Sequence, residues 1–72
     1  MTITLRTENR IMYTQFEGKL AEAFMTQCTQ YLKWMDHQTY MFEEESGSLP
    51  LSFGGAEVMT IYIWKGCIVE MN

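Results

Sequence analysis

The sequence has little histidine and cysteine, and their scarcity argues against a metal-binding protein. A single histidine, His37, and two distant cysteines, Cys28 and Cys67, stand among 72 residues. They form no C-x-x-C pair and none of the paired ligand spacings of a structural zinc site. We therefore expect no metal and no other cofactor, and we expect both cysteines to be buried, reduced thiols. In a secreted form a Cys28–Cys67 bridge would be possible, and the sequence alone does not decide this.

Basic residues are also few, because five Lys and Arg stand against nine Asp and Glu, for a net charge of −4. The five are scattered, whereas nucleic-acid-binding proteins usually present a basic face; they are Arg6, Arg10, Lys19, Lys33 and Lys65. We expect no direct binding to DNA or RNA. No apolar run approaches the roughly 18 residues that a membrane span needs, and the polar N-terminus does not read as a secretory signal. These absences favour a cytoplasmic protein without a membrane partner.

Motifs for catalysis are absent as well. The sequence contains no Gly-x-Ser-x-Gly nucleophile turn and no Gly-rich phosphate-binding loop. Asp36 and His37 are the only acid and imidazole neighbours, and adjacent residues on a helix do not face each other. A general acid–base pair of Glu57 with His37 is the enzymatic alternative, although nothing in the spacing favours it. The sequence thus favours a non-enzymatic protein.

Large apolar side chains are abundant for so short a chain. The apolar share is 47%, with seven Met, two Trp, four Tyr and four Phe. A domain of this size buries a limited fraction of its surface, so some of these side chains must remain exposed. Contiguous exposed apolar patches usually mark an interface, whereas single exposed apolar residues are normal. The composition points to a protein partner or to a homodimer.

The hydrophobic pattern predicts an α+β fold. Alternation of period two predicts strands over residues 2–7 and 11–17, joined as a hairpin. After Gly18 the period changes, and a helical stripe predicts a helix over residues 19–37. The stripe consists of Leu20, Phe24, Cys28, Tyr31, Leu32 and Met35.

The second half of the chain contains three further β-prone segments, which predict strands over residues 39–43, 57–64 and 67–71. Lys65-Gly66 is the expected hairpin turn between the last two, and Trp64 is expected to close that hairpin through a cross-strand pair. We therefore expect a single domain over residues 1–72. Its fold would be a small antiparallel sheet in ββαβββ order with one amphipathic helix packed on one face.

The segment 44–57 is rich in Gly, Ser and Pro and is expected to be a loop. Leu49, Leu51 and Phe53 are apolar residues within it. A long loop that carries apolar residues is often a recognition element. The alternative is that Leu51 and Phe53 fold under the sheet and cap the core, and the sequence leaves both open.

Two further features point to a protein partner. Glu43, Glu44 and Glu45 form a run of like charges that, with Asp36, could make an acidic corner for a basic surface. The alternative is that these charges lie on a solvated surface and bind nothing, as most charge runs of this length do. Trp34 lies off the apolar stripe of the expected helix and is a candidate anchor for a partner.

These observations support three hypotheses. The first is a non-enzymatic protein-interaction module that binds a basic partner surface; its candidate binding residues are Trp34, Asp36, Glu43, Glu44, Glu45, Leu49, Leu51 and Phe53. By general character it suits a small acidic inhibitor of the phage-encoded type, which blocks a nucleic-acid-binding machine by placing carboxylates where phosphates would lie. The second is a structural homodimer paired through an open strand, since residues 58–64 are uncharged and β-prone. The third is a small enzyme or ligand carrier.

Overall fold

The computed structural model describes residues 1–7 and 9–72 and contains one α-helix and seven strands. The strands and helices follow one another along the chain as β1 (Thr2–Arg6), β2 (Tyr13–Glu17), α1 (Lys19–Cys28), a short 3-10 helix (Thr29–Tyr31), β3 (Leu32–Asp36), β4 (Thr39–Phe42), β5 (Ser48–Phe53), β6 (Ala56–Tyr62) and β7 (Ile68–Met71). The predicted α+β class is confirmed. The predicted single sheet in ββαβββ order is wrong, because the strands form two antiparallel sheets.

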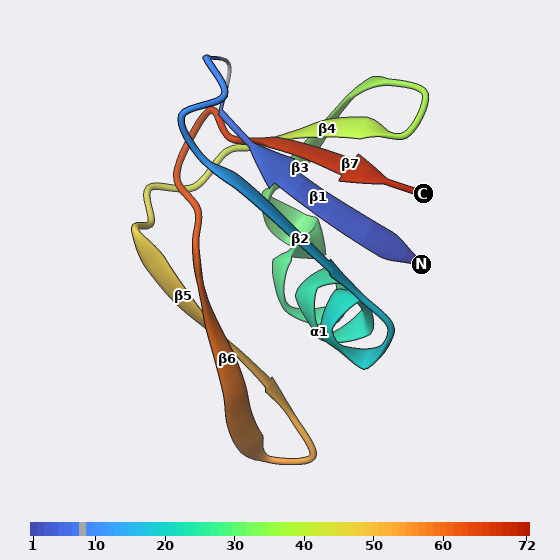
Figure 1. The fold of residues 1–72 in the computed structure, drawn as a ribbon, viewed down its shortest axis with the longest axis vertical. Coiled ribbons are helices and arrows are strands. Elements are labelled where there is room, and N and C mark those ends of the chain that lie inside the picture. Colours follow the sequence, from blue (N-terminus) through green and yellow to red (C-terminus); the bar gives the residue numbers. More distant parts are fainter. Residues whose placement is uncertain (8) are drawn as a thin grey trace.

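The larger sheet has five strands in the order β2-β1-β7-β4-β3, and every neighbouring pair is antiparallel. The expected hairpin of β1 and β2 is present, with Ile3 opposite Phe16. The last strand, β7, lies in the centre of this sheet between β1 and β4. Thr2 and Asn72 exchange two backbone hydrogen bonds of 3.0 and 2.9 Å, so the two chain ends lie side by side (Figure 1).

The helix is shorter than predicted. α1 ends at Cys28, one turn of 3-10 helix follows, and residues 32–36 form the edge strand β3. The hydroxyl of Thr29 donates to the carbonyl of Met25 at this end of the helix. Leu32 is both the next position of the helical stripe and the cross-strand partner of the buried Phe42. A short apolar pattern fits both periods, and here pairing with β4 decides the outcome.

The expected loop over residues 44–57 contains strand β5 and the first residues of β6, so the loop prediction is wrong for 48–53. β5 and β6 form a separate two-stranded sheet, with Leu51 opposite Met59. Gly54 and Gly55 join them with φ values of 63° and 79°. Two consecutive residues in the left-handed region favour a tight hairpin turn, which glycine allows at no steric cost. Gly-Gly was therefore the hairpin signal in this segment.

The predicted hairpin of the last two strands is also wrong. Within residues 1–7 and 9–72, β6 pairs only with β5, whereas β7 pairs with β1 and β4. Residues 64–67 form a turn in which the amide of Cys67 donates to the carbonyl of Trp64 over 3.0 Å. This turn carries the chain from one sheet to the other, so Trp64 does not close a hairpin.

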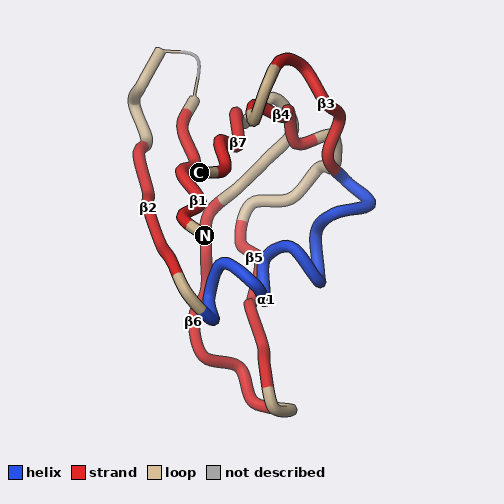
Figure 2. Tube along the Cα trace, turned by 90° about the vertical axis from the view of Figure 1, so that its right-hand side faces the viewer, coloured by secondary structure: helices blue, strands red, loops and turns tan. Residues whose placement is uncertain are grey.

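The core lies where the two sheets and α1 meet. α1 contacts both β2 and β5, and Figure 2 shows the β5–β6 hairpin extending beyond the larger sheet beside the helix. Phe16 and Phe24 pack with ring centroids 5.7 Å apart. The most deeply buried side chains come from all these elements; they are Ile3, Leu5, Phe24, Cys28, Phe42, Leu51, Ile61, Ile63, Cys67 and Val69. Within the described residues, no helix has the length and hydrophobicity needed to cross a membrane.

Candidate protein-interaction site

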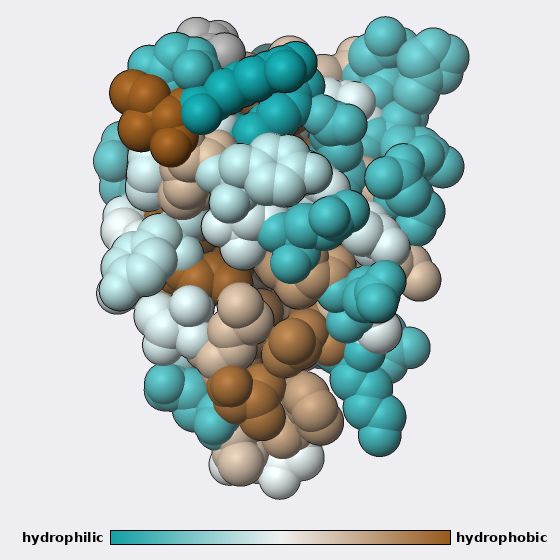
Figure 3. Space-filling view, in the orientation of Figure 1, coloured by the Kyte–Doolittle hydropathy of each residue, from teal (hydrophilic) through white to brown (hydrophobic). Residues whose placement is uncertain are grey.

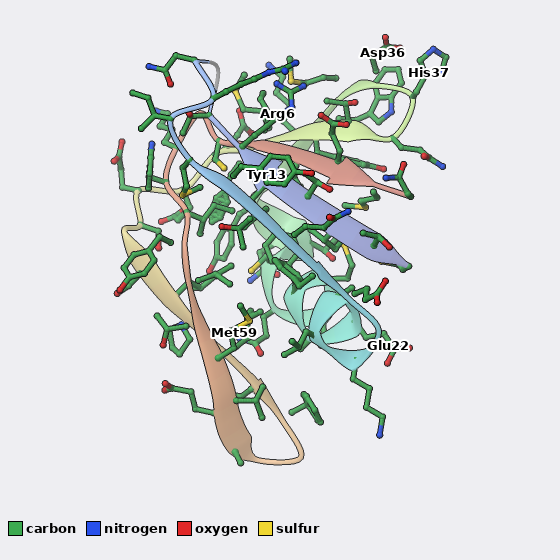
Figure 4. The ribbon with its side chains drawn as sticks, viewed as in Figure 1. Arg6, Tyr13, Glu22, Asp36, His37 and Met59 are labelled. Atoms are coloured by element: carbon green, nitrogen blue, oxygen red, sulfur yellow. The ribbon has the colours of Figure 1, made fainter. Side chains whose placement is uncertain are left out.

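The turn between β3 and β4 projects from one end of the molecule. We call Trp34, Met35, Asp36 and His37 the β3–β4 tip. His37 adopts the left-handed conformation with φ of 47°, which lets two residues reverse the chain direction. The register between the strands shifts between Trp34 and Asp36, so the edge strand is irregular here. Figure 4 shows Asp36 and His37 pointing away from the body of the protein.

Trp34 is the largest exposed side chain of this tip. Its indole is 61% exposed, yet its Nε1 donates a hydrogen bond of 2.9 Å to the backbone carbonyl of His37. Tyr40 lies opposite it on β4. The hydrogen bond fixes one edge of the ring to the turn while the ring itself faces solvent. An aromatic side chain that is exposed and already oriented loses little conformational entropy when a partner covers it.

Asp36 and His37 lie beside one another at the tip but form no shielded acid–base pair. Asp36 Oδ1 is 3.5 Å from His37 Nε2, and the two side chains are 76% and 90% exposed. Interactions between charges exposed to this degree are weak and screened by salt. The tip therefore offers Asp36 as a solvated carboxylate next to an aromatic ring.

The acidic segment, Glu43 to Glu45, follows β4 and is exposed throughout. The backbone amide of Glu43 donates to the carbonyl of Tyr31 over 2.7 Å, which fixes where the segment leaves the sheet. Asp36 stands at the other end of β4. The four residues of that strand separate it from Glu43 by about 13 Å at the usual rise of a strand. The structure therefore does not bring these four carboxylates together as one corner.

The apolar residues of the expected loop are distributed between core and surface. Leu51 is fully buried and Leu49 packs against the core, so Leu51 is inaccessible to a partner. The alternative in which Leu51 folds under the sheet and caps the core is therefore correct for this residue. Phe53 is 41% exposed, and Lys19 Nζ lies 6.0 Å from its ring centroid. Phe53 borders a shallow hollow of about 410 Å³ between α1 and β5, whose lining includes Glu22 and Thr26.

A second hollow of about 430 Å³ lies between the β1–β2 turn and the turn that follows β6. Trp64 and Lys65 line it together with Ile11, which is exposed. Sequence reasoning had placed Ile11 in a strand and had not singled it out. Among the described residues that line this hollow, Lys65 is the one titratable group.

The cysteines are poorly suited to chemistry. Cys28 and Cys67 are both buried and unbridged, as expected from the sequence. Burial raises the pKa of Cys28 to about 11. Burial also raises the pKa of Cys67, an effect that the positive charge of Arg6 partly opposes. Because the thiolate is the reactive form, neither thiol is an activated nucleophile at neutral pH.

The other chemical alternatives are not assembled either. His37 lies at the β3–β4 tip, whereas Glu57 lies near the start of β6 at the opposite end of the molecule (Figures 1 and 4). This arrangement does not form the acid–base pair considered for an enzyme. In the part of the chain that the structure describes, no group of three or more His, Cys, Asp or Glu side chains is placed to hold a metal ion.

Sequence reasoning missed two features around this site. Met35 is exposed beside Trp34, and it was assigned to the apolar stripe of a helix that ends earlier. Gln27 was assigned no role, yet its side-chain amide bonds to the β5 backbone, donating to Pro50 O over 3.0 Å and accepting from Ser52 N over 2.7 Å. No sequence signal marks such a long-range contact.

Comparison with known proteins adds no functional assignment. No protein-family model, no curated protein and no solved structure matches this chain.

Proposed function

We propose that this protein is a non-enzymatic interaction module that binds a protein partner through the β3–β4 tip. The single observation that supports this most is the Trp34 indole, which is 61% exposed and hydrogen-bonded to the turn. Trp is among the residues most enriched at the energetic centres of interfaces, where it fills an apolar pocket on the partner. Met35 lies beside it and adds an adaptable apolar contact.

The charge of the chain indicates the kind of partner surface. Asp36 adjoins Trp34, the segment Glu43–Glu45 lies at the other end of β4, and the net charge is −4. The roughly 13 Å between these groups fits within one interface of standard size, about 800 Å² on each partner. We therefore propose a partner that offers an apolar pocket for Trp34 within a basic surface.

A narrower version of this proposal is a small acidic inhibitor of the phage-encoded type. Carboxylates on a rigid frame would occupy the sites where a nucleic-acid-binding protein holds phosphates. Such a partner must carry Lys and Arg in a phosphate-binding groove. Nucleic acid would then compete with this protein for the partner, whereas it would not compete if the acidic groups meet a basic surface of another kind.

The location that we propose is the cytoplasm. Cys28 and Cys67 are free thiols within the core, which suits a compartment that keeps thiols reduced.

The rival role as a structural homodimer is supported by a different observation, the open edge of β6, and is developed below. A small enzyme or carrier remains the least supported function, because no described cluster of side chains favours a reaction.

The experiment is affinity capture from an extract of the native cells, with the wild type and the triple variant Glu43→Lys, Glu44→Lys and Glu45→Lys as baits. Washes at low and high salt separate the contribution of charge pairs from that of apolar contacts, since salt screens exposed charge pairs. We expect one discrete partner whose retention falls at high salt and in the triple variant. If the partner is retained equally at high salt and by the triple variant, the acidic segment is not part of the binding site. If no partner is captured, the proposal as a whole is contradicted.

A further inference from the structure

The two edges of the small β5–β6 sheet differ in how their backbone groups are satisfied. On the β5 side, the Gln27 amide bonds to Pro50 O and Ser52 N, and Pro50 itself has no N–H to offer. These contacts close the β5 edge. In the part of the chain that the structure describes, β6 has β5 as its one neighbour in the sheet, so its far edge is open there.

The hydrogen-bond pattern shows which residues of β6 face that open edge. Ile63 N donates to Gly47 O over 3.2 Å, so the pair Gly47 and Ile63 is bonded. Bonded and non-bonded pairs alternate along an antiparallel ladder. The pair Leu49 and Ile61 is therefore bonded as well, and the N–H and C=O groups of Thr60 and Tyr62 point away from β5.

The other free strand edges of the described residues carry more protection against pairing than β6 does. β3 carries Lys33 and Asp36 and has an irregular register, and β2 has only five residues and ends in Glu17. Charges, irregularities and short length are the devices by which proteins protect open strands. β6 has seven residues. Its register against β5 shifts once, at Val58, which has no partner on β5, but its stretch from Val58 to Tyr62 is uncharged and rich in β-branched and aromatic residues.

We propose that β6 pairs antiparallel with β6 of a second copy of this chain, around a two-fold axis at Thr60. Thr60 would exchange backbone hydrogen bonds with Thr60 of the second copy. Val58, which is 45% exposed, would lie opposite Tyr62, which is 64% exposed. Pairs of aromatic and β-branched side chains directly opposite each other stabilise a sheet.

Charge is compatible with this self-pairing. Glu57 is the only charged residue of β6, and in this register it faces Ile63 of the second copy rather than its own equivalent. The pairing therefore brings no like charges opposite each other along the strand. Figure 3 shows hydrophobic atoms gathered over the lower half of the molecule, where β6 runs, and the second copy would cover part of this surface.

The symmetry of the pairing provides a sharp test, because Thr60 would face its own copy. Thr60→Lys and Thr60→Glu should each weaken dimerisation about fivefold or more, since like charges directly opposite in a sheet are destabilising. An equal mixture of the two variants should dimerise again as a heterodimer. The matched controls are Thr26→Lys and Thr26→Glu, which change an exposed threonine on α1. They should dimerise like the wild type in sedimentation equilibrium.

A measurement on the unaltered protein covers the case in which a variant fails to fold. Hydrogen exchange at the amides of Thr60 and Tyr62 should slow as the concentration of the wild type rises, while exchange at Gln15 on β2 should not change. A wild type that remains monomeric at all concentrations overturns the proposal. A dimer that both Thr60 variants leave intact also overturns it, because the interface would then lie elsewhere.

Discussion

The Trp34 indole donates its N–H to the carbonyl oxygen of His37, across the turn that joins β3 and β4. The bond links an exposed ring to a residue in the left-handed conformation, so the turn and the ring hold each other in place. Two Trp residues occur in the chain, and only for Trp34 is an indole hydrogen bond found among the described residues.

This bond has a direct spectroscopic consequence. The Trp34 indole N–H should exchange with solvent more slowly than that of Trp64, because the exchange requires the hydrogen bond to open. Proton NMR in D₂O measures both rates, and Trp34→Phe assigns the signals by removing one of them. Equal exchange rates would show that the ring is not held to the turn.

The core and the surface contain phenylalanines that permit a matched comparison. Phe24 is fully buried beneath the sheet, whereas Phe53 is 41% exposed. Phe24→Ala should lower the free energy of unfolding by about 3–5 kcal/mol, because it leaves a cavity in the core. Phe53→Ala should lower it by less than about 1 kcal/mol. Urea unfolding followed by circular dichroism compares them, and similar losses for both variants would be inconsistent with the packing described.

The side chain of Gln27 acts as a clamp on the edge of β5. Gln27→Ala removes the hydrogen bonds to Pro50 O and Ser52 N and should lower the free energy of unfolding by about 1–2 kcal/mol. The amide of Ser52 should then exchange faster with solvent. Gln30→Ala, a change at an exposed position of the 3-10 helix, is the control and should leave Ser52 unaffected. Unchanged exchange in the Gln27 variant would mean that the clamp does not protect this edge.

The buried thiol of Cys28 predicts a loss of stability at alkaline pH. Its pKa is raised to about 11 in the folded protein, from 9.0 for an unperturbed thiol, so the folded state binds the proton more tightly than the unfolded state does. The stabilising contribution is complete below about pH 9 and is lost as pH rises through about 11. Cys28→Ala should therefore show a shallower decline of unfolding free energy than the wild type across this range. Equal slopes would contradict the assignment to Cys28, since the two proteins differ at this residue alone.

The elements with an unambiguous local pattern could be predicted from the sequence. Alternation around Ile3 and Leu5 identified β1, and the stripe of Leu20, Phe24 and Cys28 identified α1. The extension of that helix was wrong because Leu32 suits a helical stripe and a strand equally. Only its pairing with Phe42, which is ten residues away, decides between them. Sheet order is likewise a long-range property, and no local signal indicated that β7 would insert between β1 and β4.

The candidate site was predictable in part. Trp34 and Asp36 were selected for residue type, and the structure places both at one exposed tip, although on a strand rather than a helix. The separation of Asp36 from the Glu43–Glu45 segment follows from β4 lying between them. Leu51 is buried because β5 pairs with β6 in the register that places Leu51 opposite Met59. The local sequence, in which apolar residues stand among Ser and Gly, does not indicate this pairing.

The most direct test of the account is the affinity of the captured partner for the wild type and for two tryptophan variants, Trp34→Ala and Trp64→Ala. Trp34→Ala should retain the fold, because its ring is mostly exposed, and should weaken binding by about 2 kcal/mol or more, roughly 30-fold. Trp64→Ala should bind with near wild-type affinity. If Trp34→Ala binds as tightly as the wild type, the β3–β4 tip is not the interaction site and the central claim is wrong.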